Sequence, residues 1–268
     1  DWENNTGMNK TAKKKAISRI SALHYAKLIF RSCLFLIASF IYVTDRVKGA
    51  PRPLERLDVP PAVMVFIWLV FIVEMIFRFF PSRLESMGCQ KQFRSNYIPS
   101  GKEFAAAVNP GEPPHSTMIV AGSWFLLNGL IFSLFFFDVI DGGILILISL
   151  AYSVCDMICI LFFCPFQEWM MKNKCCGSCR IYNWDYAMMF TPLLPLQSFY
   201  AQSLLFISIA LLINWEIYFR LHPERFYENT NLALSCSNCK EKLCSHKKSL
   251  RTFLIRRSEI IKKALEKS

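Results

Sequence analysis

Two clusters of cysteines carry the residue types in this sequence that are best suited to chemistry. The downstream cluster has the pattern C-x2-C-x4-C-x-H, and its members are Cys236, Cys239, Cys244 and His246. Three thiolates and one imidazole within so short a segment match the ligand set of a tetrahedral zinc site. The pattern therefore predicts bound zinc, with an iron–sulfur cluster as the alternative metal centre. Disulfides in an extracellular tail, or thiols without a ligand, are the other interpretations.

The upstream cluster lies between two apolar stretches, and its cysteines are Cys175, Cys176 and Cys179. It supplies three thiolates but no obvious fourth ligand, which Asp185, water or a residue of the tail could provide. The C-x2-C pair within it could instead form a redox-active dithiol, since Lys174 and Arg180 favour the thiolate. A palmitoylated or merely structural loop is the remaining interpretation. If both clusters lie on the same side of a membrane, a composite metal site becomes reasonable.

A second set of chemically capable residues lies within the apolar stretches themselves. Ionisable groups there are costly and often functional. Glu74 and Arg78 are one helical turn apart and can pair on one face, and Asn128 could hydrogen-bond to a neighbouring helix. Asp156 has no cation within a turn of its own helix, so it predicts a proton or cation site in the bilayer. Arg31, near one end of its stretch, is expected to reach the headgroups.

The elements that must position these residues are membrane-spanning helices. The chain has 268 residues, is 53% hydrophobic, and its apolar residues come in runs near 20 residues, the length that crosses a hydrocarbon layer of about 30 Å. Backbone groups in lipid must be satisfied within the segment, so these runs predict helices. The predicted fold is an all-α polytopic transmembrane bundle of about five spans, at 24–43, 62–80, 117–137, 144–164 and 199–219.

The segment 186–195 is also apolar, but Pro192 and Pro195 interrupt it. It is too short to span and predicts a half-helix, or the kinked start of the next span. Together these elements divide the chain into a basic N-terminal segment (1–23), a transmembrane domain (24–219) and a tail (220–268). The end of the tail, residues 247–268, has the pattern of an amphipathic basic helix.

The net charge of +11 is concentrated at helix flanks and in the terminal segments. This distribution predicts contact with anionic lipids and not with nucleic acid. The terminal helix is expected to lie on an anionic leaflet or to pack against a partner, either another membrane protein or a second copy of the chain.

The charge pattern also predicts a multi-pass protein of the cell membrane with its N-terminus in the cytoplasm. The turn 138–143 has no cation, which places it on the opposite side. Five spans would then place the tail outside, whereas its 12 basic residues among the 31 of the chain favour the inside.

Three functions are compatible with these features. The first is an accessory, sensor or redox component with a thiolate metal site at the membrane face. The second is a small proton- or cation-coupled transporter or channel using Asp156 and Glu74. The third is a lipid-acting membrane enzyme with Asp185, Tyr182 and Trp184 at the headgroup level, where Asn183 is also expected. Nucleotide-binding loops and the HExxH and GxSxG motifs are absent, and four histidines are too few for a membrane haem protein with paired axial ligands.

Overall fold

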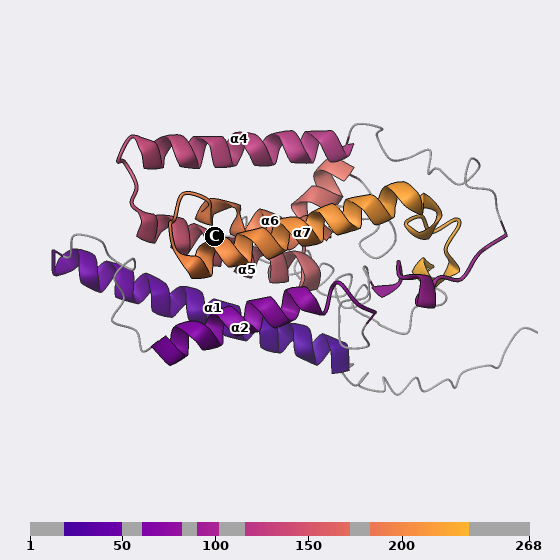
Figure 1. The fold of residues 1–268 in the computed structure, drawn as a ribbon, viewed down its shortest axis with the longest axis horizontal. Helices are drawn as coiled ribbons and strands as arrows, with labels where there is room; N and C mark the ends of the chain where they lie inside the picture. Colours follow the sequence, from indigo (N-terminus) through magenta and orange to yellow (C-terminus); the bar gives the residue numbers. More distant parts are fainter. Residues whose placement is uncertain (1–18, 50–60, 82–89, 102–115, 172–182, 236–268) are drawn as a thin grey trace, which may run out of the picture.

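A computed structural model shows a bundle of long helices (Figure 1). It describes residues 19–49, 61–81, 90–101, 116–171 and 183–235. The long helices are α1 (Arg19–Val47), α2 (Pro61–Ile76), α4 (Ser116–Phe136), α5 (Gly142–Leu161) and α7 (Phe199–Leu221). Shorter helical turns connect them: η1 (Arg94–Asn96), η3 (Phe166–Met171), α6 (Asp185–Phe190), η5 (Thr191–Leu193), η6 (Pro223–Arg225) and η7 (Leu232–Leu234).

Four of the helices, α1, α4, α5 and α7, are long and apolar enough to cross a membrane. The predicted second span is present as α2, but it has only 16 residues. At 1.5 Å per residue its length is about 24 Å, less than the roughly 30 Å of a hydrocarbon layer. The described part of the chain is thus all-helical, with four helices that are able to span a membrane, while the count of five full spans stays a prediction.

Helices α1 and α5 lie antiparallel along most of their length (Figure 1). At one end Asp141 caps α5, because its Oδ1 accepts a hydrogen bond from the Ile144 backbone N–H at 3.0 Å. The other carboxylate oxygen of Asp141 lies 3.1 Å from the Tyr42 hydroxyl and 3.5 Å from Arg46. At the opposite end the rings of Tyr25 and Phe162 meet edge to face. We call the end at which α1 begins the N-terminal end of the bundle.

The proline-broken segment forms α6 and η5, which pack against α5 and α7. Ser149, near the middle of α5, donates a hydrogen bond of 2.9 Å to the Met189 carbonyl of α6. The segment begins beside Arg78, just after α2, and α7 begins beside the first half of α2, where Trp68 donates to Ser203. Residues 185–198 therefore run from the N-terminal end of the bundle towards the other end, and α7 returns.

The chain after α7 packs against the chain after α2. Asn231 is completely buried, and its Nδ2 donates to the carbonyls of Lys91 and Arg225 at 3.0 and 2.9 Å. Backbone bonds from Ser100 and Leu232 join the same two segments. The segment that follows α7 consequently lies at the same end of the bundle as the start of α1 (Figure 1). Because residues 185–198 run back through the bundle before α7 begins, the described part of the tail, 220–235, lies at the same end as the start of α1.

The core lies where α2, α6 and α7 meet. Phe71 and Phe190 contact edge to face at 5.4 Å, and Trp215 packs between Phe93 and Phe226. Outward-facing positions on α4 carry large exposed apolar side chains such as Phe125 and Leu126. Such a surface suits hydrocarbon, in which apolar groups need no burial.

Candidate functional site

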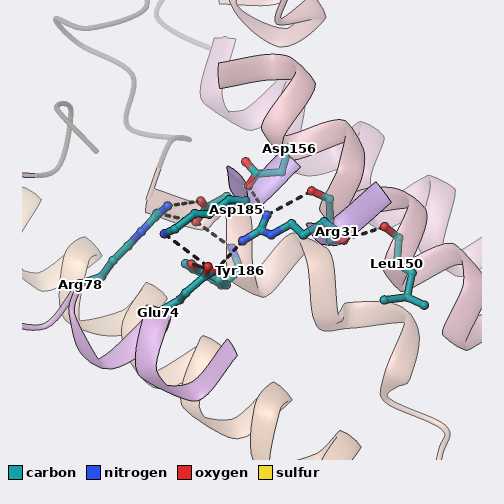
Figure 2. A network of polar contacts seen from close by, with 9 residues as sticks. Arg31, Glu74, Arg78, Leu150, Asp156, Asp185 and Tyr186 are labelled. Carbon is teal, nitrogen blue, oxygen red and sulfur yellow. Dashed lines mark hydrogen bonds and ion pairs between the residues drawn. The ribbon is translucent and has the colours of Figure 1, made fainter. Parts of the chain in front are cut away.

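A network of charged side chains crosses the interior of the bundle near its N-terminal end (Figure 2). Lys27 and Arg31 lie on one face of α1 because residues three or four apart in a helix point the same way. Glu74 of α2 and Arg78 just beyond it share a face for the same reason. α5 contributes Asp156, and the start of α6 contributes two further residues described below.

Arg31 is the centre of this network. Its side chain is only 1% exposed, and its Nη2 lies 2.7 Å from Oε2 of Glu74. Nη1 lies 3.0 Å from Oδ2 of Asp156 and donates to the Ser153 carbonyl at 3.1 Å. The prediction that Arg31 reaches the headgroups is therefore wrong. Two carboxylates on other helices offset the cost of burying its charge, and only the fold could bring them together.

Tyr186 of α6 joins the two halves of the network. Its hydroxyl donates to the same Glu74 oxygen that Arg31 contacts, at 3.0 Å. The Arg78 guanidinium lies 4.6 Å from the centre of the Tyr186 ring, and that of Arg31 lies 6.0 Å away. The ring thus combines a hydrogen bond to a carboxylate with cation–π contact to two arginines.

Arg78 and Asp185 form a two-pronged ion pair, the arrangement that gives guanidinium–carboxylate contacts their strength. The distances are 2.6 Å from Nη2 to Oδ2 and 2.8 Å from Nη1 to Oδ1. Oδ1 of Asp185 also accepts from the Tyr186 backbone N–H at 2.8 Å. This pair fastens the start of α6 to the end of α2.

The network balances its charges. Lys27 completes it, with its Nζ 3.4 Å from Oε1 of Glu74. The cations are Lys27, Arg31 and Arg78, and the carboxylates are Glu74, Asp156 and Asp185. Equal numbers of both signs let six ionisable groups share an interior in which any single charge would be strongly unfavourable. Adding or removing one proton upsets that balance.

His24 lies one turn before Lys27 on α1, and the sequence reasoning missed it. Its side chain is 2% exposed, and neither ring nitrogen has a hydrogen-bond partner among the residues that the structure describes. The sequence signal was its spacing. Lys27 follows His24 by three residues and Arg31 follows it by seven, so all three lie on one helical face.

Asn128 takes no part in the network. It is buried on α4, and its Nδ2 donates to the Trp124 carbonyl of the same helix at 3.0 Å. Its Oδ1 has no partner within the described part of the chain. The expected hydrogen bond to a neighbouring helix is thus not seen in this part of the chain.

Three of the residues expected at the headgroup level, Asn183, Trp184 and Asp185, are held by neighbouring segments, and the fourth, Tyr182, lies outside the described residues. Asn183 is buried and donates to Oε1 of Gln92 at 3.1 Å. Trp184 is half-buried and donates to Glu216 of α7 at 2.7 Å, and Asp185 is buried in its pair with Arg78. These contacts explain the positions of all three without a lipid substrate.

Both cysteine clusters, residues 175–179 and 236–246, lie outside the described residues. Within the described ranges no group of three or more histidine, cysteine and acidic side chains is arranged to hold a metal. The segments that flank the clusters are described, however. Asn183 follows the first cluster and is bonded to Gln92, while Asn231 precedes the second and is bonded to Lys91.

Comparison with known proteins assigns neither a family nor a function to the chain. No protein-family model, curated protein or solved structure matches this chain. The geometry of the network and of the segments beside the cysteines therefore carries the functional argument.

Proposed function

We propose that the chain is a proton-coupled membrane transport protein whose coupling site is Arg31 between Glu74 and Asp156. The observation that carries the proposal is one fully buried guanidinium shared by carboxylates of α2 and α5. Intramembrane acids and bases in such arrangements mark ion pathways and proton relays more often than other residues do.

The arrangement favours a proton over a metal cation as the coupled ion. Arg31 already occupies the position between the two carboxylates, at 2.7 and 3.0 Å. A metal ion would have to displace a guanidinium of the same sign, whereas a proton needs only one carboxylate lone pair. Protonation of Asp156 would neutralise it and weaken the hold of Arg31 on α5.

The change in bonding can be converted into movement. Arg31 connects α1 to α2 through Glu74 and to α5 through Asp156. With Asp156 neutral, Arg31 keeps its shorter contact to Glu74 and loses the ionic part of its contact to α5. Protonation then favours any conformation in which α5 has shifted relative to α1, which is how ligand binding changes conformational populations.

A flux measurement tests this function. Purified protein in liposomes containing a pH-sensitive dye is exposed to a K⁺ diffusion potential set with valinomycin, and then to a Na⁺ gradient. We expect proton flux above that of protein-free liposomes, and we expect Asp156→Asn to remove it. Asp138→Asn is the matched control, because Asp138 is an exposed turn residue with positive φ, which asparagine tolerates.

The alternative outcome is a network with a purely structural role. In that case wild-type protein shows no flux above the protein-free liposomes under either gradient. A wild-type flux that Asp156→Asn leaves unchanged, in protein that folds normally, would also reject the proposed coupling site.

A second candidate function is a thiolate metal site at the N-terminal end of the bundle, acting as a sensor or redox component. What favours it is the attachment of both flanking segments to the adjacent residues Lys91 and Gln92. Those attachments bring the residues that follow the first cysteine cluster and the residues that precede the second to one region of the bundle. Zinc is the first choice for such ligands, and an iron–sulfur cluster is the second.

Metal analysis of the purified protein tests this candidate directly. We expect about one zinc per chain, the stoichiometry of a single tetrahedral site. Cys236→Ser combined with Cys239→Ser should remove it, while Cys33→Ser, which changes an exposed free cysteine of α1, should leave it in place. Protein with neither zinc nor iron would exclude a resident metal site.

A further inference from the structure

On α1, α2 and α5, the side of the network that faces away from the N-terminal end of the bundle has no neighbouring charged side chain or histidine. Between Arg31 and Asp45, α1 has no acidic or basic residue and no histidine. The same holds for α2 before Glu74 and for α5 before Asp156. Towards the N-terminal end, by contrast, Lys27 and His24 continue the polar face of α1. On these three helices, the histidine and the lysine that could lead a proton to Glu74 or Asp156 therefore lie towards the N-terminal end.

His24 is the outermost member of this polar face that the structure describes. It precedes Arg31 by seven residues, about 10 Å along the axis at 1.5 Å per residue. The charged groups that act on its ring are Lys27 and Arg31 of the same helix, Glu74 of α2, and Arg78 just beyond α2. Its position is thus between the charge network and the end of the bundle.

The two ring nitrogens lack hydrogen-bond partners among the described residues although the side chain is 98% buried (2% exposed). A buried polar group without a partner costs about 1–3 kcal/mol. A histidine that served only packing would therefore destabilise the fold more than an apolar residue of similar size. Such a cost is typical of functional sites, where the group must be free to bind something that comes and goes. For a neutral imidazole with a free lone pair, the smallest such species is a proton.

We propose that His24 is the proton-access residue of the Arg31–Glu74–Asp156 site, reached from the N-terminal end of the bundle. This rests on the transport function proposed above. A proton from the aqueous side binds one ring nitrogen and gives an imidazolium. The same proton then leaves for a carboxylate of the network, the imidazole returns to its neutral form, and one carboxylate becomes a neutral acid. No other reactant is required.

The balance of charge makes the imidazolium short-lived. Three cations already face three carboxylates, so a fourth positive charge beside Lys27 and Arg78 is repelled by both. Glu74 is the carboxylate whose field reaches His24. An access residue needs this combination, because it must accept a proton and then release it towards the carboxylates.

His24→Gln provides the test, because glutamine keeps a donor and an acceptor in the same region but does not titrate. In the liposome assay we expect proton flux to fall about a hundredfold or more, because a positioned proton-transfer group typically contributes about 10²–10⁴-fold. His222→Gln is the matched control. It is the same substitution at a more exposed histidine at the end of α7, and it should leave flux unchanged.

A second measurement applies even if His24→Gln folds poorly. Nitrogen-15 magnetic resonance of wild-type protein reports the charge of each ring, and with four histidines in the chain the signals are separable. The His24 ring should exchange between neutral and charged forms on acidification while the fold persists. A ring that stays neutral until the protein unfolds would overturn the proposal.

The outcomes separate this inference from the transport function on which it rests. If His24→Gln transports within about twofold of wild type while Asp156→Asn is inactive, His24 is not the access residue but the coupling site stands. If wild-type protein moves no protons, both fail. Loss of flux in both variants, with His222→Gln normal, supports both.

Discussion

Removing the central cation should destabilise the bundle strongly. In Arg31→Met the apolar stem is kept and the guanidinium is lost. Glu74 retains Lys27 at 3.4 Å and the Tyr186 hydroxyl at 3.0 Å. Asp156 loses its contact with the Arg31 guanidinium at 3.0 Å. The mutation thus leaves Glu74 with two of its partners, whereas Asp156 loses its ion pair with Arg31.

The size of the effect follows from burial. Removing one partner of a buried ion pair costs about 3–5 kcal/mol in soluble proteins. In membranes the unfolded helices also find polar partners, so the low end, about 3 kcal/mol, is expected. Arg46→Met is the matched control. Arg46 is 63% exposed and lies 3.5 Å from Asp141, and exposed pairs contribute only about 0–1 kcal/mol.

The measurement is reversible unfolding of purified protein in mixed detergent micelles, followed by circular dichroism. Adding Asp156→Asn to Arg31→Met should restore part of the loss, because it removes the uncompensated charge. The reasoning would be refuted if Arg31→Met lowered the unfolding free energy no more than Arg46→Met does. It would also be refuted if the double variant were less stable than Arg31→Met alone.

Three further substitutions test other contacts by the same unfolding measurement. Tyr186→Phe removes the hydroxyl bond to Glu74 but keeps the ring beside Arg78, so we expect a loss of about 1 kcal/mol; a loss as large as that of Arg31→Met would contradict this. Ser149→Ala should cost about 0.6 kcal/mol, the average for hydrogen bonds between membrane helices, whereas Ser133→Ala, which removes a bond within α4, should cost less. Asn231→Ala removes bonds to two carbonyls and should cost about 2 kcal/mol; faster amide hydrogen exchange in residues 90–101 checks it, and unchanged exchange there would show that the segments are held by other contacts.

The residue pattern alone was enough to predict where the long helices lie along the chain. The predicted spans 117–137 and 199–219 differ from α4 and α7 by two residues or fewer at each end. The interruption at Pro192 was also foreseen, since proline cannot continue a helix. These features depend on local sequence, because a membrane helix satisfies its backbone hydrogen bonds within itself.

The sequence also identified Glu74, Arg78 and Asp156 as unusual, because charged groups in apolar stretches are rare. It offered Arg78 as a partner for Glu74, but it could not supply the partners on other elements, Arg31 for Glu74 and Asp185 for Arg78. Arg31 and Asp156 are 125 positions apart, and only the antiparallel packing of α1 against α5 brings them within 3.0 Å. His24 was missed for a related reason, since its burial depends on tertiary packing and cannot be read from its own helix.

Residue type and spacing thus determined which segments are helices and which side chains are costly to bury in them. Tertiary structure decided which charges meet, how they balance, and at which end of the bundle residue 235 lies. The physical reason is the range of the interactions. Helix formation is local along the chain, whereas an ion pair depends on a distance of a few ångströms that packing alone sets.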